Sequence, residues 1–104
     1  MAKIMISATA DADVEDILDY LADEAGISTV VKYERSFDEL YEHLALYPES
    51  CPRRPRLDPA ARLGIVSPYV VLYTYVPVDD TVSIVRVIHG RRRITKKLFH
   101  EKKK

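Results

Sequence analysis

The chain is 104 residues long, of which 47% are hydrophobic and 31% charged, and it contains a single cysteine, Cys51. This length suits one compact domain over residues 1–104, and the composition excludes a disordered or collagen-like chain. No apolar run approaches the roughly 20 residues that span a bilayer, and the N-terminus lacks a secretory signal. Because one cysteine cannot form an internal disulfide, we expect a cytoplasmic protein without membrane contact.

The two halves of the chain carry opposite charge, although the formal net charge is zero. Residues 1–50 hold three basic and twelve acidic side chains, a balance of −9, and residues 51–104 hold thirteen basic and four acidic, a balance of +9. A basic region is the usual electrostatic footprint of an anionic partner. The alternative is that the two halves neutralise each other in the fold.

The first half predicts a strand followed by two helices. Residues 3–7 alternate as a short strand does, and apolar residues then recur at helical spacing over residues 14–22, behind acidic residues that suit a helix N-terminus. Gly26 is the expected C-cap of this helix, and Ser28 or Thr29 is the expected N-cap of the next.

The second helix is expected to end near Leu46, because Pro48 cannot continue it. Two helices joined by two or three residues form an antiparallel hairpin. The four prolines in residues 47–59 exclude both regular helix and central strand, so this segment is a connecting loop.

The second half predicts three strands, over residues 62–66, 69–76 and 81–88, which are rich in β-branched and aromatic side chains and separated by turn residues. Successive strands with short connections pair antiparallel. We therefore expect an α+β fold in which the helical hairpin packs on one face of a small, mainly antiparallel sheet, in the order β-α-α-β-β-β. A short C-terminal helix or tail follows, its basic end frayed from about residue 97.

Alternation along the strands assigns side chains to the two faces of the sheet. The odd positions of residues 69–76 include Tyr69, Tyr73 and Tyr75, and the even positions are mostly aliphatic. If the aliphatic set packs on the helices, the tyrosines and Arg86 line the open face, which then suits an amphipathic partner segment. The alternative is that the tyrosines complete the core.

Four phrases of the sequence, in order, resemble a known family. They are DADVEDILDYLADEAG, YPESCPRRPRL, SPYVVLYTYV and DTVSIVRVIHGRRRI. From about residue 4 to about residue 94, the chain resembles the ParE branch of the RelE/ParE superfamily of bacterial toxin–antitoxin modules.

This resemblance implies a toxin that a ParD-like antitoxin neutralises by wrapping its C-terminal segment around it. ParE-type toxins are reported to act on DNA gyrase and block replication, whereas RelE-type toxins cut messenger RNA in the ribosomal A site. Operator DNA is then contacted only indirectly, through the antitoxin. The resemblance implies no cofactor, and His43 and His100 have no partners at metal-ligand spacing.

RNA cleavage without a metal needs a proton acceptor, cations around the phosphorane and a proton donor. The resemblance implies that toxins of the RelE branch supply these groups with lysines and arginines on the sheet and a tyrosine near the C-terminus. Here Val70 stands where its strand arginine is expected, no lysine occurs between Lys32 and Lys96, and Tyr75 is the last tyrosine. These absences favour a toxin that acts by binding, without catalytic residues, and for such a toxin the ParE resemblance implies inhibition of DNA gyrase. The alternatives are a ribosome-dependent ribonuclease and a degenerate toxin that only binds its antitoxin.

The residues expected to contact the target or the antitoxin are basic or aromatic and belong to the second half. His89 is expected to cap the end of its strand rather than to act as an acid or base. Arg53, Arg54 and Arg56 are expected to pair with the acidic first helix rather than with the antitoxin. The binding candidates are Arg62, Tyr69, Tyr73, Tyr75, Arg86, His89, Arg91, Arg92, Arg93, Lys96 and Lys97.

Overall fold

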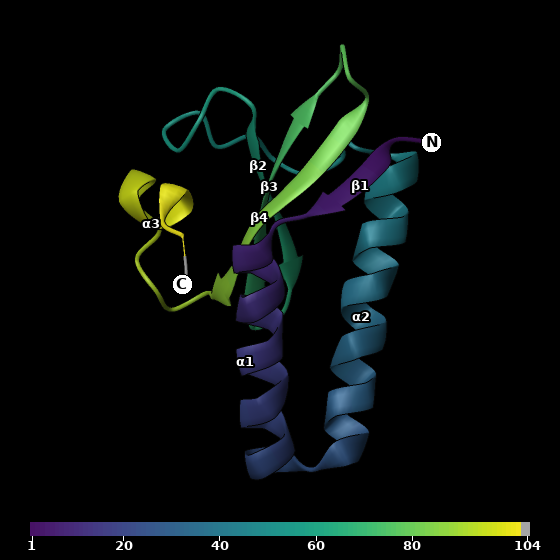
Figure 1. The fold of residues 1–104 in the computed structure, drawn as a ribbon, viewed down its shortest axis with the longest axis vertical. Coiled ribbons are helices and arrows are strands. Elements are labelled where there is room, and N and C mark those ends of the chain that lie inside the picture. Colours follow the sequence, from purple (N-terminus) through teal and green to yellow (C-terminus); the bar gives the residue numbers. More distant parts are fainter. Residues whose placement is uncertain (103–104) are drawn as a thin grey trace.

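The computed structural model describes residues 1–102, which form four strands and three helices (Figure 1). In chain order the elements are β1 (Lys3–Ile6), α1 (Ala8–Ala25), α2 (Ile27–Leu46), β2 (Ala61–Val66), β3 (Tyr69–Val76), β4 (Thr81–His89) and α3 (Lys96–His100). The predicted α+β class and element order are confirmed. The end of the predicted basic tail, residues 103–104, lies outside the described residues.

The four strands form one mixed sheet in the order β1-β4-β3-β2. β2 pairs with β3 and β3 with β4 in antiparallel register, as expected, and only β1 runs parallel to its neighbour β4. β1 can pair in parallel because the helical hairpin follows it in the chain. The hairpin is a crossover long enough for the chain to enter the sheet again in the direction of β1, and after the antiparallel β3 the strand β4 also runs in that direction. No helix within residues 1–102 is long and apolar enough to cross a membrane.

The helical hairpin covers one face of the sheet and extends beyond it, so that the α1–α2 connection lies at one end of the molecule (Figure 1). Ser7 caps α1, its hydroxyl accepting a hydrogen bond from the Ala10 amide at 3.0 Å. Gly26 alone joins the helices and has a φ of 87°, a conformation that suits glycine. The predicted Ser28 or Thr29 cap is wrong, because this glycine reverses the chain so tightly that α2 begins at Ile27; the Thr29 hydroxyl donates to the Ala25 carbonyl instead.

Replacing Gly26 with alanine should lower the free energy of unfolding by about 1–3 kcal/mol, since the combination of φ 87° and ψ 172° is open essentially to glycine alone. An added Cβ would meet no atom within 4 Å, so the cost arises from the backbone and not from a clash. Urea denaturation measures the effect, with the exposed Ser28→Ala as the control. Equal midpoints for the two variants would contradict the prediction.

Apolar side chains fill both faces of the sheet, in two clusters. The first lies between the sheet and the helical hairpin, and its buried members include Leu21, Phe37, Leu44, Val66, Tyr69, Val71, Tyr73, Val82, Ile84 and Val87. The second lies on the opposite face and contains Leu57, Ala61, Leu63, Leu72, Ile88, Leu98 and Phe99. The face expected to be open is therefore covered by α3 and by the proline-rich loop.

The predicted orientation of β3 is wrong, because its tyrosines face the helices and its aliphatic residues face α3. Tyr69 is buried edge-on against Tyr33, with ring centroids 5.7 Å apart, and Tyr73 is fully buried, its hydroxyl donating to the Pro48 carbonyl at 3.0 Å. Tyr75 is half-buried against the same cluster. The tyrosines thus complete the core, the alternative left open by the sequence, and burial raises the pKa of both Tyr69 and Tyr73.

Candidate interaction surface

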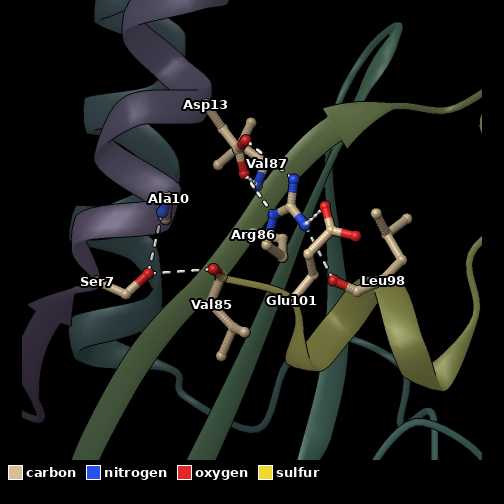
Figure 2. Close-up of polar contacts among 8 residues, drawn as sticks. All are labelled: Ser7, Ala10, Asp13, Val85, Arg86, Val87, Leu98 and Glu101. Atoms are coloured by element: carbon tan, nitrogen blue, oxygen red, sulfur yellow. Dashed lines mark hydrogen bonds and ion pairs between the residues drawn. The ribbon is translucent and has the colours of Figure 1, made fainter. Parts of the chain in front are cut away.

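Arg86 is buried and joins α1 to α3 across the edge of β4 (Figure 2). Its Nε donates to Asp13 Oδ2 at 2.8 Å and its Nη2 to Asp13 Oδ1 at 3.1 Å, a bidentate pair. On the other side, Nη1 donates to the Leu98 carbonyl at 3.0 Å and lies 3.7 Å from Glu101 Oε1. The hydrogen bonds to Asp13 hold the pKa of Arg86 above its ordinary value.

This network forms where β1 ends and α1 begins. Beyond Ile6, no strand within residues 1–102 pairs with the outer edge of β4, and the start of α1 with its N-cap supplies hydrogen-bond partners instead. The Ser7 hydroxyl donates to the Val85 carbonyl at 3.1 Å, and Asp13 Oδ2 accepts from the Val87 amide at 3.0 Å (Figure 2). Asp13 therefore accepts hydrogen bonds both from the backbone at the edge of β4 and from the buried guanidinium of Arg86.

The expectation that Arg86 lies on an exposed face is wrong. Alternation does turn Arg86 away from the hairpin, to the same face as its pairing partner Leu72. The β3–β4 register shifts by one residue at Val85, and α3 covers this part of the sheet. Arg86 is only 1% exposed. It therefore holds the fold together and is not available to a partner.

Arg62 is also engaged within the chain. Its Nη1 donates to the carbonyls of Glu49 and Cys51 at 3.0 and 2.8 Å, and its Nη2 lies 3.5 Å from Glu49 Oε2. These contacts fasten the start of the proline-rich loop to β2. Arg62 therefore fixes the path of the loop, and its position does not favour a role in binding a partner.

His89 ends β4 and shapes the turn that follows, as the sequence analysis expected. Its Nδ1 accepts a hydrogen bond from the Arg91 amide at 3.0 Å, and its carbonyl accepts one from the Arg92 amide at 3.0 Å. The ring packs edge-on against Tyr69, with centroids 5.6 Å apart. His89 thus directs the chain out of the sheet into the basic segment.

The basic segment comprises Arg91, Arg92, Arg93, Lys96 and Lys97, all of them exposed. Within residues 1–102, none of these side chains forms an ion pair; the three pairs join Arg62 to Glu49 and Arg86 to Asp13 and Glu101. Among the described residues, the pairs Arg62–Glu49 and Arg86–Asp13 link the acidic half to the basic half, and neither involves the basic segment. The basic segment keeps its charge available for an anionic partner.

The three arginines of the proline-rich loop do not pair with the acidic first helix, contrary to expectation. Arg53 Nη2 donates to the Pro59 carbonyl at 3.0 Å, and Arg54 Nη1 donates to the Arg53 carbonyl at 2.9 Å. All three side chains, including Arg56, are exposed. The physical reason is position: the loop crosses the sheet face opposite to the helical hairpin.

The structure brings the proline-rich loop next to the basic segment, around an apolar slot of about 400 Å³. The slot is lined by Arg54, Pro55, Arg56, Leu57, Leu63 and Ile94. We call this feature the basic slot. The sequence did not predict the slot, because its apolar members come from three separate segments and Leu57 stands singly in an irregular one, where no periodicity marks it.

The acidic half forms a separate groove of about 370 Å³ between α1 and α2. Asp11 and Glu15 line it from α1, and Glu34 and Asp38 line it from α2. Burial, together with the nearby Asp38 and Asp11, raises the pKa of Tyr41 in this groove to about 12. Within residues 1–102, no group of three or more histidine, cysteine or acidic side chains has the arrangement of a metal site.

Comparison with known proteins now decides the family. Residues 4–94 match the family described as the ParE toxin of the type II toxin-antitoxin system parDE. The chain belongs to this family. The resemblance found in the sequence phrases is thereby confirmed, and the matched region includes Arg91–Arg93 and Ile94 but ends before α3.

A solved structure with the same fold comes from a chromosomal ParDE toxin–antitoxin system of P. aeruginosa. Its TM-score is 0.71 at 19% sequence identity, and the alignment covers 86% of this chain and 96% of that one. No curated protein sequence matches the chain. At this identity the structural match supports the fold of the ParE family member, including the helical hairpin packed on the sheet.

Proposed function

We propose that this ParE family member is a cytoplasmic toxin that arrests growth by binding DNA gyrase and that a ParD-like antitoxin neutralises. The family match over residues 4–94 carries the proposal. Binding rather than catalysis is supported by two residues of the sheet. Arg86 is buried in ion pairs, and the half-buried Val70 stands where the resemblance leads us to expect the RelE-type strand arginine. The groups that remain accessible, Arg91–Arg93, are suited to recognition of an anionic surface.

The decisive experiment is inducible expression in a bacterial host, alone and together with the small gene adjacent to it. Expression alone should stop growth, and DNA breaks trapped on gyrase should appear before any shortening of messages. Co-expression should restore growth and yield a stable complex of the two proteins. Replacing Arg91 and Arg92 by alanine tests the basic segment against a pair on α2 that loses the same charge, Lys32→Ala with Arg35→Ala.

The other outcomes distinguish the alternatives. Messages cut in the ribosomal A site, before gyrase-linked breaks and dependent on Arg91 and Arg92, would identify a ribosome-dependent ribonuclease instead. Harmless expression combined with stable complex formation would identify a degenerate toxin. Failure to form a complex with the neighbouring gene product would overturn the antitoxin assignment.

A further inference from the structure

We propose that the basic slot binds a short acidic peptide segment of a partner protein, with one large aliphatic side chain of that segment inserted between Leu57, Leu63 and Ile94. The inference rests on the proposed function and deepens it, because it states the chemistry of the segment that this toxin recognises. The proline-rich loop supplies Arg54 and Arg56 to this slot, and Ile94 reaches it from a segment almost 40 positions further along the chain. Neither segment of the sequence predicts the slot by itself.

The slot has a preformed apolar floor. Leu57 and Leu63 are 5% and 8% exposed and pack in the cluster that also contains Phe99. Backbone hydrogen bonds hold both: the Leu57 amide donates to the Arg54 carbonyl at 3.0 Å, and the Leu63 amide to the Pro52 carbonyl at 3.0 Å. An inserted side chain therefore meets an ordered surface, which keeps the ordering cost of binding low.

The rim of the slot carries positive charge that the fold leaves uncompensated. Arg54 contacts only the neighbouring Arg53 carbonyl through its guanidinium, and Arg56 forms no ion pair within residues 1–102. Arg54 and Arg56 both line the slot, beside its apolar members. Two guanidinium groups next to an apolar pocket complement an aliphatic residue flanked by carboxylates.

The lining favours a peptide over a nucleic acid. Single-stranded nucleic acids bind where a basic groove offers aromatic rings on which bases stack, and the residues around this slot include no aromatic ring. Leucine, isoleucine and proline instead suit an aliphatic side chain. The volume of about 400 Å³ is near the lower end of the roughly 300–1,000 Å³ typical of ligand pockets, which suits one side chain with its flanking backbone.

The test is fluorescence anisotropy with the full chain and a labelled acidic peptide that has one central leucine among aspartates and glutamates. Arg54→Glu with Arg56→Glu should weaken binding by about tenfold, because like charges then face the peptide. Lys32→Glu with Arg35→Glu, the same charge change on α2, should leave binding within about twofold. A peptide with serine in place of the leucine should bind about tenfold more weakly, because it lacks the inserted apolar group.

Three results would overturn the proposal. Equal losses from the two charge-reversed pairs would mean that only net charge matters, and equal binding of the leucine and serine peptides would mean that the slot is not used. Tighter binding of a single-stranded oligonucleotide of the same charge would make this a phosphate-binding surface. Since the assay measures binding and not growth arrest, a toxic chain that ignores the peptide refutes this inference alone, and a harmless chain that binds it refutes the proposed function alone.

Discussion

Replacing Asp13 with alanine should lower the free energy of unfolding by about 3–5 kcal/mol, because it removes the buried, bidentate counter-ion of Arg86 and leaves only Glu101, which is half exposed and 3.7 Å away. Asp13 is 4% exposed and Arg86 1%, so water cannot take over the lost contacts. The substitution also removes the acceptor of the Val87 amide, 3.0 Å away at the strand edge. Urea denaturation monitored by circular dichroism measures the change.

Two further variants separate the ion pair from a general effect of charge. Asp19→Ala removes an exposed carboxylate from the same helix and should change stability by less than about 0.5 kcal/mol. The double variant Asp13→Leu with Arg86→Met should recover much of the loss, since replacing both members of a buried pair costs less than orphaning one. A single Asp13→Ala variant as stable as Asp19→Ala would contradict the assigned role.

The order of elements could be predicted from the sequence because each element carries its own local signal. The helices show 3.6-residue periodicity, the strands are rich in β-branched residues, and proline and glycine mark the connections. Gly26 shows the limit of such signals. A glycine predicted the end of α1, but its positive φ made it the whole connection, so that α2 began before the serine and threonine expected to cap it.

The orientation of the strands could not be predicted, because both faces of the sheet are covered. A strand that is half exposed alternates between apolar and polar residues, whereas β3 is apolar on both sides and its alternation does not say which set faces the helices. The sequence also left α3 without an assigned position. Once Leu98 and Phe99 cover the second face, Arg86 becomes buried there and the tyrosines pack under the hairpin.

The basic residues fell into two groups that the sequence could not separate. Arg62 and Arg86 are engaged by carbonyls and carboxylates brought from elsewhere in the chain, the latter by Asp13, 73 positions away. Arg91 to Arg93 follow the turn made by His89 and remain free of ion pairs within residues 1–102. An arginine shows its role only through long-range partners, which no local pattern encodes.

Replacing Phe99 with alanine should lower the free energy of unfolding by about 3–5 kcal/mol, the usual cost of emptying the space of a buried phenylalanine. Phe99 is 2% exposed and anchors α3, a helix of five residues, on the second apolar cluster. So short a helix has little stability of its own. Besides the Thr95 cap, whose hydroxyl accepts from the Leu98 amide at 3.1 Å, and the Arg86 hydrogen bond to the Leu98 carbonyl, it depends on this packing. Urea denaturation measures the loss, with the exposed Lys97→Ala as the control.

The same substitution should loosen the basic slot, because Leu57 and Ile94 pack in the cluster that Phe99 fills. Amide hydrogen exchange at residues 92–99 should therefore rise more than exchange in the β3–β4 pair, which is held by its own ladder. Under conditions where the variant remains folded, the acidic peptide should bind more weakly to it than to Lys97→Ala. A loss of stability below about 1 kcal/mol, or exchange that rises evenly over the whole chain, would mean that the packing of α3 does not support the slot.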